Sequence, residues 1–189
     1  MNSVFVKILS VLLALIMSIS LCACDGSKKE EPTKRPQGSP PPISKDGYYG
    51  LGDVVNIQGI VYTLTGAKKS YGKDPQERVG EGDIFICLEF DVENFTTFDF
   101  GLGSIGLFSS YDNVSVKSQD TMAKRVFGDR TMPTVLKAGE KKSFTACYRI
   151  PEDFGFFQID FAILVLSSMH VGLKIPAEDF ELVDLNKKQ

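Results

Sequence analysis

A chain of 189 residues with 43% apolar residues can form one ordinary domain with extensions, or at most two small domains. Its formal charge of −3, from 21 basic and 24 acidic residues, excludes the large basic surface that nucleic-acid binding requires. The 14 Phe, six Tyr and 17 Gly, with no Trp, favour a protein of many strands and turns over a helical bundle.

The first segment of the chain, residues 1–23, is organised like a bacterial signal peptide. Lys7 precedes an apolar run, Ile8–Leu21, that only serines interrupt. The run is shorter than the ~20 apolar residues that a membrane-spanning helix needs, and it has the length of a signal-peptide core. It ends in LCAC at positions 21–24, which resembles the lipobox of bacterial lipoproteins.

The lipobox resemblance implies that the chain is cut before Cys24 and that the Cys24 thiol becomes a diacylglyceryl thioether. Each buried methylene contributes about 0.8 kcal/mol to membrane binding, so two or three long acyl chains anchor a protein firmly. An uncleaved membrane anchor is the alternative. Cys22 and Cys24 form a poor half of a zinc site, because zinc ligands are usually spaced by two to four residues and no second cluster completes the set. We therefore expect the membrane as a partner through lipidated Cys24.

The second segment, residues 24–46, is rich in proline and mixed charges and has almost no apolar residues. Such a segment cannot bury enough apolar surface to fold. Proline-rich chains are extended by about 3.1 Å per residue, so a spacer of this kind holds a domain up to about 60 Å from the membrane. We expect a disordered tether.

The third segment, residues 47–189, contains short apolar stretches separated by Gly, Pro, Asn and Asp. About seven or eight short strands without a helix-length periodic segment predict an all-β, immunoglobulin-like sandwich of two antiparallel sheets. Residues 117–134 fit either a short helix or an irregular edge. The expected strands are 54–64 with a bulge at Gly59, 84–92, 100–108, 114–116 after a turn at 111–113, 144–150 ended by Pro151, 157–166, 171–175 and 180–185.

Two of these strands alternate clearly enough to assign their faces. In 84–92 and in 144–150, the even-numbered positions are apolar and are expected to face the core. The odd-numbered positions, which include Cys87 and Cys147, are expected to face the other side. Both cysteines therefore lie on the less apolar face of their strands.

Four segments, in this order, carry a family resemblance: IVYTLTGAKKS (60–70), DIFICLEFDVEN (83–94), LKAGEKKSF (136–144) and CYRIPEDF (147–154). Together they resemble the telokin-like, immunoglobulin-like domain of unknown function that is common in lipoproteins of Gram-positive bacteria. That family is similar in fold to an immunoprotective extracellular antigen of mycobacteria. The resemblance implies a lipid-anchored domain on the extracytoplasmic face of the cell membrane, and it brings no catalytic or binding residues to this chain.

Cys87 and Cys147 are the two cysteines of the third segment. Export would place them in a compartment that permits disulfides. An antibody-type bridge between sheets requires inward side chains beside a Trp, and neither condition is met. In the usual strand order of the family, the two strands are neighbours in one sheet. Two interpretations stay open: a cross-strand disulfide, or two half-buried free thiols.

No pattern of catalytic or metal-binding residues is apparent. His170 is the only histidine, its adjacent serines are too close in sequence to imply a triad, and no Gly-x-Ser-x-Gly elbow occurs. Asp91, Glu93 and Asp99 offer oxygens for weak calcium binding, but their spacing is not that of an EF-hand. We expect no catalytic residues, no cofactor and no metal.

Aromatic residues near strand ends are the remaining signal. Exposed aromatics at one end of a sandwich indicate a ligand or partner surface, although most of these residues are expected to pack in the core. They are Phe95, Phe98, Phe100, Phe154, Phe156 and Phe157.

The expected function is therefore a lipid-anchored, non-catalytic binding module on the cell surface. Its partner would be a protein or an envelope polymer, contacted through end loops or an open sheet edge, and not a nucleic acid. The alternatives are an accessory subunit of a membrane or envelope complex and, more remotely, a hydrolase that uses a pair of carboxylates.

Overall fold

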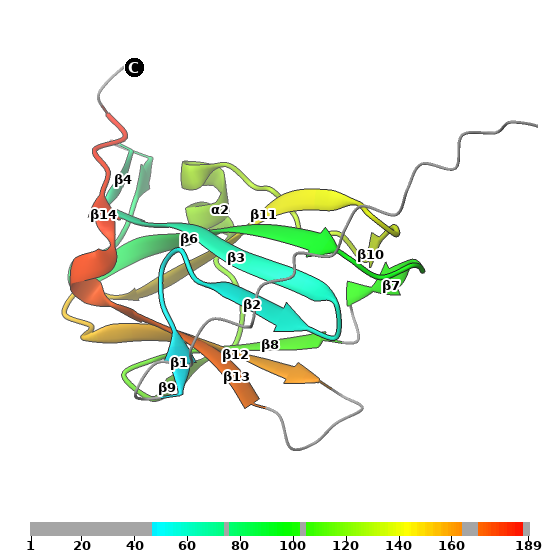
Figure 1. Cartoon of the computed structure of the whole chain (residues 1–189). Helices are drawn as coiled ribbons and strands as arrows, with labels where there is room; N and C mark the ends of the chain where they lie inside the picture. Colours follow the sequence, from blue (N-terminus) through cyan, green and yellow to red (C-terminus); the bar gives the residue numbers. More distant parts are fainter. Residues whose placement is uncertain (1–46, 74–75, 103–104, 164–169, 187–189) are drawn as a thin grey trace, which may run out of the picture. The chain divides into compact units, whose positions relative to one another are not determined.

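The computed structural model of the chain describes residues 47–73, 76–102, 105–163 and 170–186 (Figure 1). The expected signal peptide, tether and lipidation site at Cys24 lie outside these residues. Within the described part, no helix combines the length and apolarity needed to cross a bilayer.

The described strands form two main sheets (Figure 1). The β8 sheet has the order β1 (Tyr48–Tyr49), β13 (His170–Pro176), β12 (Phe156–Ile163), β8 (Ile105–Tyr111) and β9 (Val114–Val116). The β6 sheet has the order β11 (Lys141–Pro151), β6 (Asp83–Asn94), β3 (Ile60–Ser70) and β14 (Glu181–Leu182), and β2 (Val54–Ile57) also pairs with β3.

Smaller elements complete the domain. Strand β7 (Phe100–Gly101) pairs with β10 (Val135–Leu136), and β4 (Gly72–Lys73) pairs with β5 (Glu77–Arg78). A 3-10 turn, η2 (Ala177–Asp179), precedes β14. Most strand pairs are antiparallel, whereas β1 with β13 and β14 with β3 are parallel.

One core fills the space between the two sheets, and this confirms the predicted two-sheet sandwich. Tyr62 of β3 lies against Phe161 of β12, with ring centroids 5.0 Å apart, and Tyr148 of β11 lies 4.9 Å from Phe157. The even-numbered positions from Ile84 to Val92 and from Phe144 to Ile150 are buried in this core, as the alternation predicts. Burying each such large side chain contributes about 1.5–3 kcal/mol.

The prediction of a single strand over 54–64 is wrong, because the chain reverses in its middle. Gln58 and Gly59 both have positive φ, 55° and 89°, and form the two-residue turn of the β2–β3 hairpin. Turns with positive φ at both positions match the twist of the strands they join. The expected bulge lies elsewhere: the register between β3 and β6 shifts between Leu64 and Gly66.

The other boundaries differ less. The predicted strand 100–108 is divided into β7 and β8, on either side of residues 103–104, which lie outside the described part. The predicted turn at 111–113 is confirmed: Asp112 and Asn113 have φ of 44° and 67° and join β8 to β9.

Residues 117–134 contain a short helix, α2 (Thr121–Phe127), so the first of the two alternatives is confirmed. The Asp120 carboxylate accepts a hydrogen bond from the Ala123 amide at 2.9 Å, which caps the first turn. Ala123 and Val126 are buried against Phe85 of β6 and the two cysteines. Helix α2 therefore covers one end of the outer face of the β6 sheet (Figure 1).

Candidate functional site

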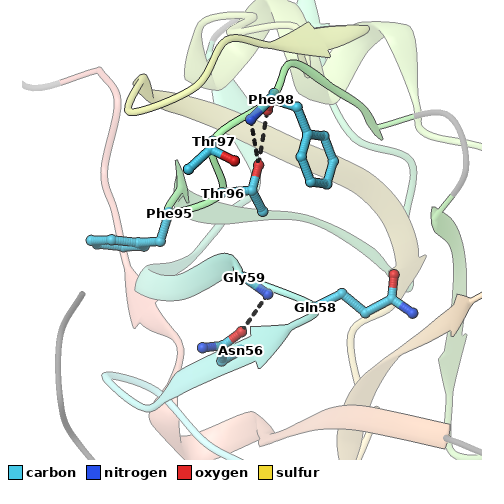
Figure 2. Close-up of a pocket in the computed structure, with 7 residues that line it drawn as sticks. All are labelled: Asn56, Gln58, Gly59, Phe95, Thr96, Thr97 and Phe98. Carbon is cyan, nitrogen blue, oxygen red and sulfur yellow. Dashed lines mark hydrogen bonds between the residues drawn. The ribbon is translucent and has the colours of Figure 1, made fainter. Parts of the chain in front are cut away.

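A pocket of about 350 Å³ lies where the β2–β3 turn meets the loop between β6 and β7 (Figure 2). Two segments that are distant in sequence form it. The lining residues are Asn56, Gln58, Gly59, Phe95, Thr96, Thr97 and Phe98.

The floor of this pocket, which we call the Phe98 pocket, is the β2–β3 turn. The Asn56 side-chain oxygen accepts a hydrogen bond from the Gly59 amide at 2.9 Å and so fixes the turn. A Cβ atom at position 59 would lie 2.8 Å from the Thr96 Cγ2 atom, closer than such contacts allow. Position 59 therefore requires glycine for its positive φ and for the close approach of Thr96.

The opposite wall is a loop that buried Asn94 holds in place. The Asn94 side-chain amide donates to the carbonyls of Phe98 and Leu136, both at 2.9 Å. Its side-chain oxygen accepts from the Thr96 amide at 2.9 Å, and the Thr96 hydroxyl lies 2.7 Å away. Every polar atom of this fully buried side chain is thus satisfied, as a buried amide requires.

The turn before β11 supports the same loop from below. The Gly139 amide donates to the Asn94 carbonyl, and the Asn94 amide donates to the Glu140 carbonyl, both at 2.9 Å. The Glu140 carboxylate accepts a hydrogen bond from the Lys137 amide at 2.9 Å. This hydrogen bond, and to a smaller extent the one from the Lys142 side chain, lowers the pKa of Glu140. The Gly139-Glu140 turn, which belongs to the family resemblance, therefore forms part of the frame of the pocket.

The two phenyl rings of the pocket lie on opposite sides of the loop, with Thr96 between them (Figure 2). Phe95 is half-buried, and its amide donates to the Gly59 carbonyl at 2.8 Å. Phe98 is 59% exposed, a large fraction for an aromatic side chain. An exposed ring on a loop that is fixed by hydrogen bonds is ready to contact a partner without further ordering.

The remaining aromatic candidates serve the sandwich itself. Phe154 and Phe157 are buried in the core, and Phe100 packs against it. Phe156 is half-buried on the outer face of the β8 sheet, with the Lys174 ammonium 4.3 Å from its ring centroid. Three of the six therefore pack in or against the core, fewer than the expected majority, and Phe98 is exposed near the end of β6.

The Phe98 pocket contains no charged group. Its lining consists of two phenyl rings, two carboxamides, two threonines and a glycine. None of these side chains can act as a general acid or base near neutral pH. The lining can stack on an apolar surface and exchange hydrogen bonds with uncharged polar groups, which is the chemistry of binding.

The acidic residues suggested for calcium are used in other ways. Asp91 binds the Lys141 ammonium at 2.8 Å and accepts from the Ser143 hydroxyl at 2.6 Å. Asp99 accepts from the Ala138 amide at 3.1 Å. Across the described ranges, no three His, Cys, Asp or Glu side chains gather so that they could hold a metal ion.

A second depression, of about 410 Å³, lies beside the 78–83 loop and includes Glu81, Asp83 and Glu152 among its lining residues. It is the place where a carboxylate-based hydrolase would be sought. Asp83 faces the Arg149 guanidinium at 3.8 Å. Desolvation and the nearby Glu152 carboxylate raise the pKa of Tyr71 on the same wall. These contacts are those of surface ion pairing and hydrogen bonding.

The other sequence candidates lie away from the pocket. His170 is the first residue of β13, opposite Ala162, and its side chain is outside the described part, as are the serines at 167 and 168. Cys87 and Cys147 face each other across β6 and β11, with their Sγ atoms 3.1 Å apart. Both are buried, so the description of half-buried thiols is wrong: α2 covers them.

Sequence reasoning found the aromatic residues of the pocket but missed its polar frame. The sequence predicts a bulge at Gly59, because a lone Gly inside a strand pattern often marks one, whereas the structure has a turn at Gln58-Gly59. The signal for Asn94 was present in Asn94-Phe95-Thr96, where an Asn two residues before a Thr suits a side chain that bonds back to its own loop.

No protein-family model matches the sequence, and no curated protein matches it. Solved structures of similar fold include ycdA of Bacillus subtilis, proposed to be a lipoprotein, with a TM-score of 0.51 and 6% identity over 67% of this chain and 39% of that chain. An uncharacterized β-sandwich protein from Clostridium difficile 630 has a TM-score of 0.43 and 14% identity, over 67% of this chain and 93% of that chain.

A third structure, of a protein from Staphylococcus aureus also proposed to be a lipoprotein, has a TM-score of 0.44 and 12% identity over 72% of this chain and 96% of that chain. At such identities the likeness concerns the fold alone. The comparison with ycdA, the one of these three with a TM-score above 0.5, supports a shared β-sheet architecture.

Proposed function

We propose that this chain is a lipid-anchored surface protein that displays a non-catalytic binding domain of the telokin-like, immunoglobulin-like family, and that the Phe98 pocket is its ligand site. The single observation that carries the proposal is the pocket itself, in which an exposed phenyl ring stands on a hydrogen-bonded loop and no lining residue is charged. The LCAC sequence at 21–24 supports the anchor.

The hydrogen bonds that fix the loop explain why we interpret the pocket as a binding site and not simply as an exposed loop. Asn94 and the Gly139-Glu140 turn fix the loop through hydrogen bonds to its backbone, so little conformational entropy is lost when a partner covers it. Covering Phe98 removes apolar surface from water, at about 25 cal/mol per Å². A central aromatic side chain of this kind can contribute about 2 kcal/mol or more to an interface.

The lining also limits the ligand. A pocket without charges gives no electrostatic advantage to an ionic ligand. Phenyl rings beside carboxamides and hydroxyls suit an uncharged, amphipathic stretch of a protein or of an envelope polymer. A spacer over residues 24–46, extended by about 3.1 Å per residue, would let the site reach partners about 60 Å from the bilayer.

The test of the pocket is site-specific crosslinking on intact cells. A photoreactive phenylalanine analogue replaces Phe98 in one variant and Phe108 in the control. Phe108 is 62% exposed, nearly the same as Phe98, but it lies on β8. We expect a discrete crosslinked product when the analogue is at position 98 and none when it is at position 108. The product should also be absent when the analogue at position 98 is combined with Gly59→Ala. Equal or absent crosslinking at both positions overturns the assignment of the pocket.

The anchor is tested separately by Cys24→Ala. The variant is expected to keep its signal peptide and to lose the mass of the acyl chains, as measured by mass spectrometry of protein from the membrane fraction. A Cys24→Ala protein that is cleaved at the same bond and still carries lipid contradicts the proposed anchor.

A further inference from the structure

The two buried cysteines are a second feature of the domain, separate from the Phe98 pocket. Cys87 of β6 and Cys147 of β11 are direct partners in the strand register. Both point to the outer face of the β6 sheet, where Ala123 and Val126 of α2 cover them. Their exposed fractions are 1% and 0%, so no other thiol or solvent contacts them in the folded domain.

The backbone around Cys147 shows which type of cross-strand pair this is. The Cys147 amide donates to the Gln119 side chain at 3.4 Å, and the Cys147 carbonyl accepts from the Asp120 amide at 2.9 Å. Two residues earlier, the Thr145 amide donates to the Arg130 carbonyl at 2.8 Å. The peptide groups of Cys147 therefore point away from β6, and Cys87–Cys147 is a non-hydrogen-bonded pair.

Pairs of this type bring side chains closest together. Their Cα atoms are about 4.5 Å apart, against about 5.5 Å in hydrogen-bonded pairs. Disulfides span Cα separations of about 4.4–6.8 Å. The Sγ atoms are already 3.1 Å apart, so a bond of about 2.05 Å requires a movement of only about 1 Å, which small side-chain rotations supply.

The contact between the sulfurs also makes the two thiols unequal. A hydrogen bond from Cys87, helped by the Thr145 hydroxyl, lowers the pKa of Cys147. The same contact, together with burial, raises the pKa of Cys87. These pKa shifts belong to the folded, reduced domain, in which both sulfurs are buried.

We propose that Cys87 and Cys147 form a disulfide in the exported protein. The proposal rests on the proposed location outside the cytoplasm, because only an oxidising compartment preserves such a bond. A disulfide oxidant supplies the chemistry. The thiolate of one cysteine attacks it and displaces one of its thiols, and the thiolate of the other cysteine then attacks the mixed disulfide and displaces the second. Two protons and two electrons leave the protein, and the oxidant ends as two thiols.

The order of folding follows from burial. In the folded domain α2 leaves no path to either sulfur, so oxidation takes place before α2 docks on β6 and β11. The bond then joins β6 covalently to β11 beneath the helix. It closes a loop between positions 87 and 147, which raises the melting temperature by roughly 10 °C in the chain-entropy model.

Peptide mapping of the full chain, purified from the membrane fraction of the cells, tests this proposal. The protein is alkylated under denaturing conditions without reduction and digested with trypsin, which releases residues 79–117 and 143–149, each with one cysteine. We expect the two peptides to be joined, and to separate on reduction. Recovery of both peptides fully alkylated without reduction overturns the proposal.

A second measurement shows which premise has failed in that event. The purified protein is reduced, unfolded and refolded with glutathione disulfide. If the bond then forms, the proposed location outside the cytoplasm is wrong. If it does not form, the inference from the strand geometry is wrong. The double variant Cys87→Ala/Cys147→Ala controls for lost packing: its melting temperature should match that of the reduced wild type within a few degrees and should not respond to reductant.

Discussion

The two ends of strand β6 are built in opposite ways. At its first residues, Phe85 and Cys87 lie under α2, and the outer face of the sheet is sealed by apolar side chains. At its last residue, Asn94 seals the backbone with hydrogen bonds and leaves the ring of Phe98 in solvent. Where apolar side chains cover a strand end, they are buried in packing and cannot contact a ligand. Where backbone hydrogen bonds hold the loop instead, a nearby aromatic side chain can stay exposed and contact one. This difference is why we place binding at one end and a structural bond at the other.

The largest expected effect comes from breaking the apolar seal. Val126→Asp puts an unpaired carboxylate among Phe85, Cys87 and Cys147. Because a buried charge without a partner is costly, α2 should detach and the free energy of unfolding should fall by about 3 kcal/mol. Urea unfolding measures the loss, and native alkylation of the reduced protein should become faster at both thiols.

Arg125→Ala is the matched control for the helix, because Arg125 is exposed on the same turn of α2. It should change the free energy of unfolding by less than about 0.5 kcal/mol and leave the thiols protected. If Val126→Asp leaves both stability and alkylation unchanged, α2 does not seal this end.

Breaking the polar frame should cost somewhat less. Asn94→Ala removes the side-chain donor of the Leu136 carbonyl, one of the two side-chain donors of the Phe98 carbonyl, and the acceptor of the Thr96 amide. We expect a loss of about 2–3 kcal/mol, since each unsatisfied buried group costs about 1–3 kcal/mol and water reaches part of the loop. Thr97→Ala, at an exposed position of the same loop, should be neutral in the same urea titration. A loss for Asn94→Ala no larger than that of Thr97→Ala contradicts the role of Asn94.

The two ends of β6 also differ in how much of their structure could be predicted from the sequence. The alternation in β6 and β11 correctly gave the core face, and it put Cys87 and Cys147 on the other face. It could not show that α2 covers that face, because a helix of seven residues is shorter than the window of about 11–18 residues in which a helical period can be recognised.

The Phe98 pocket was predictable only in part, for a related reason. Phe95 and Phe98 were singled out as aromatics near a strand end, but their partners come from a turn far away in the sequence. Between Ile57 and Ile60 the spacing of the core positions changes from two residues to three, which either a bulge or a turn can produce, and only the pairing of β2 with β3 reveals a reversal there. Local patterns predict faces of strands, whereas sites between loops depend on which loops the topology brings together.

A smaller effect is expected at the floor of the pocket. Gly59→Ala forces an L side chain into φ of 89° and a Cβ into the Thr96 methyl group. The free energy of unfolding should fall by about 1–2 kcal/mol. Gly80→Ala is the control, because nothing lies within 4 Å of its added Cβ, and it should be neutral or slightly stabilising. Equal unfolding midpoints for the two variants contradict the close packing of turn and loop.

The smallest effect is expected at Asp91, in the exposed, charged part of β6 between the end that α2 covers and Asn94. Hydrogen bonds from Lys141 and Ser143 lower the pKa of Asp91. Because the folded pKa lies below the unfolded value of about 3.9, ionised Asp91 stabilises the fold above that pH, and the contribution disappears as the pH falls through the folded pKa. The side chain is 27% exposed, so solvent screening keeps the contribution below about 1 kcal/mol.

Asp91→Asn should therefore lower the free energy of unfolding slightly at pH 7 and have no effect at the acid end of the profile. Ser143→Ala removes one of the two hydrogen bonds and should give part of the same change. Urea titrations between about pH 2 and pH 7 measure both. If the difference in free energy of unfolding between Asp91→Asn and wild type is constant over this range, the ionised carboxylate contributes nothing to stability. The hydrogen bonds and ion pair of Asp91 would then be compatible with the fold without stabilising it.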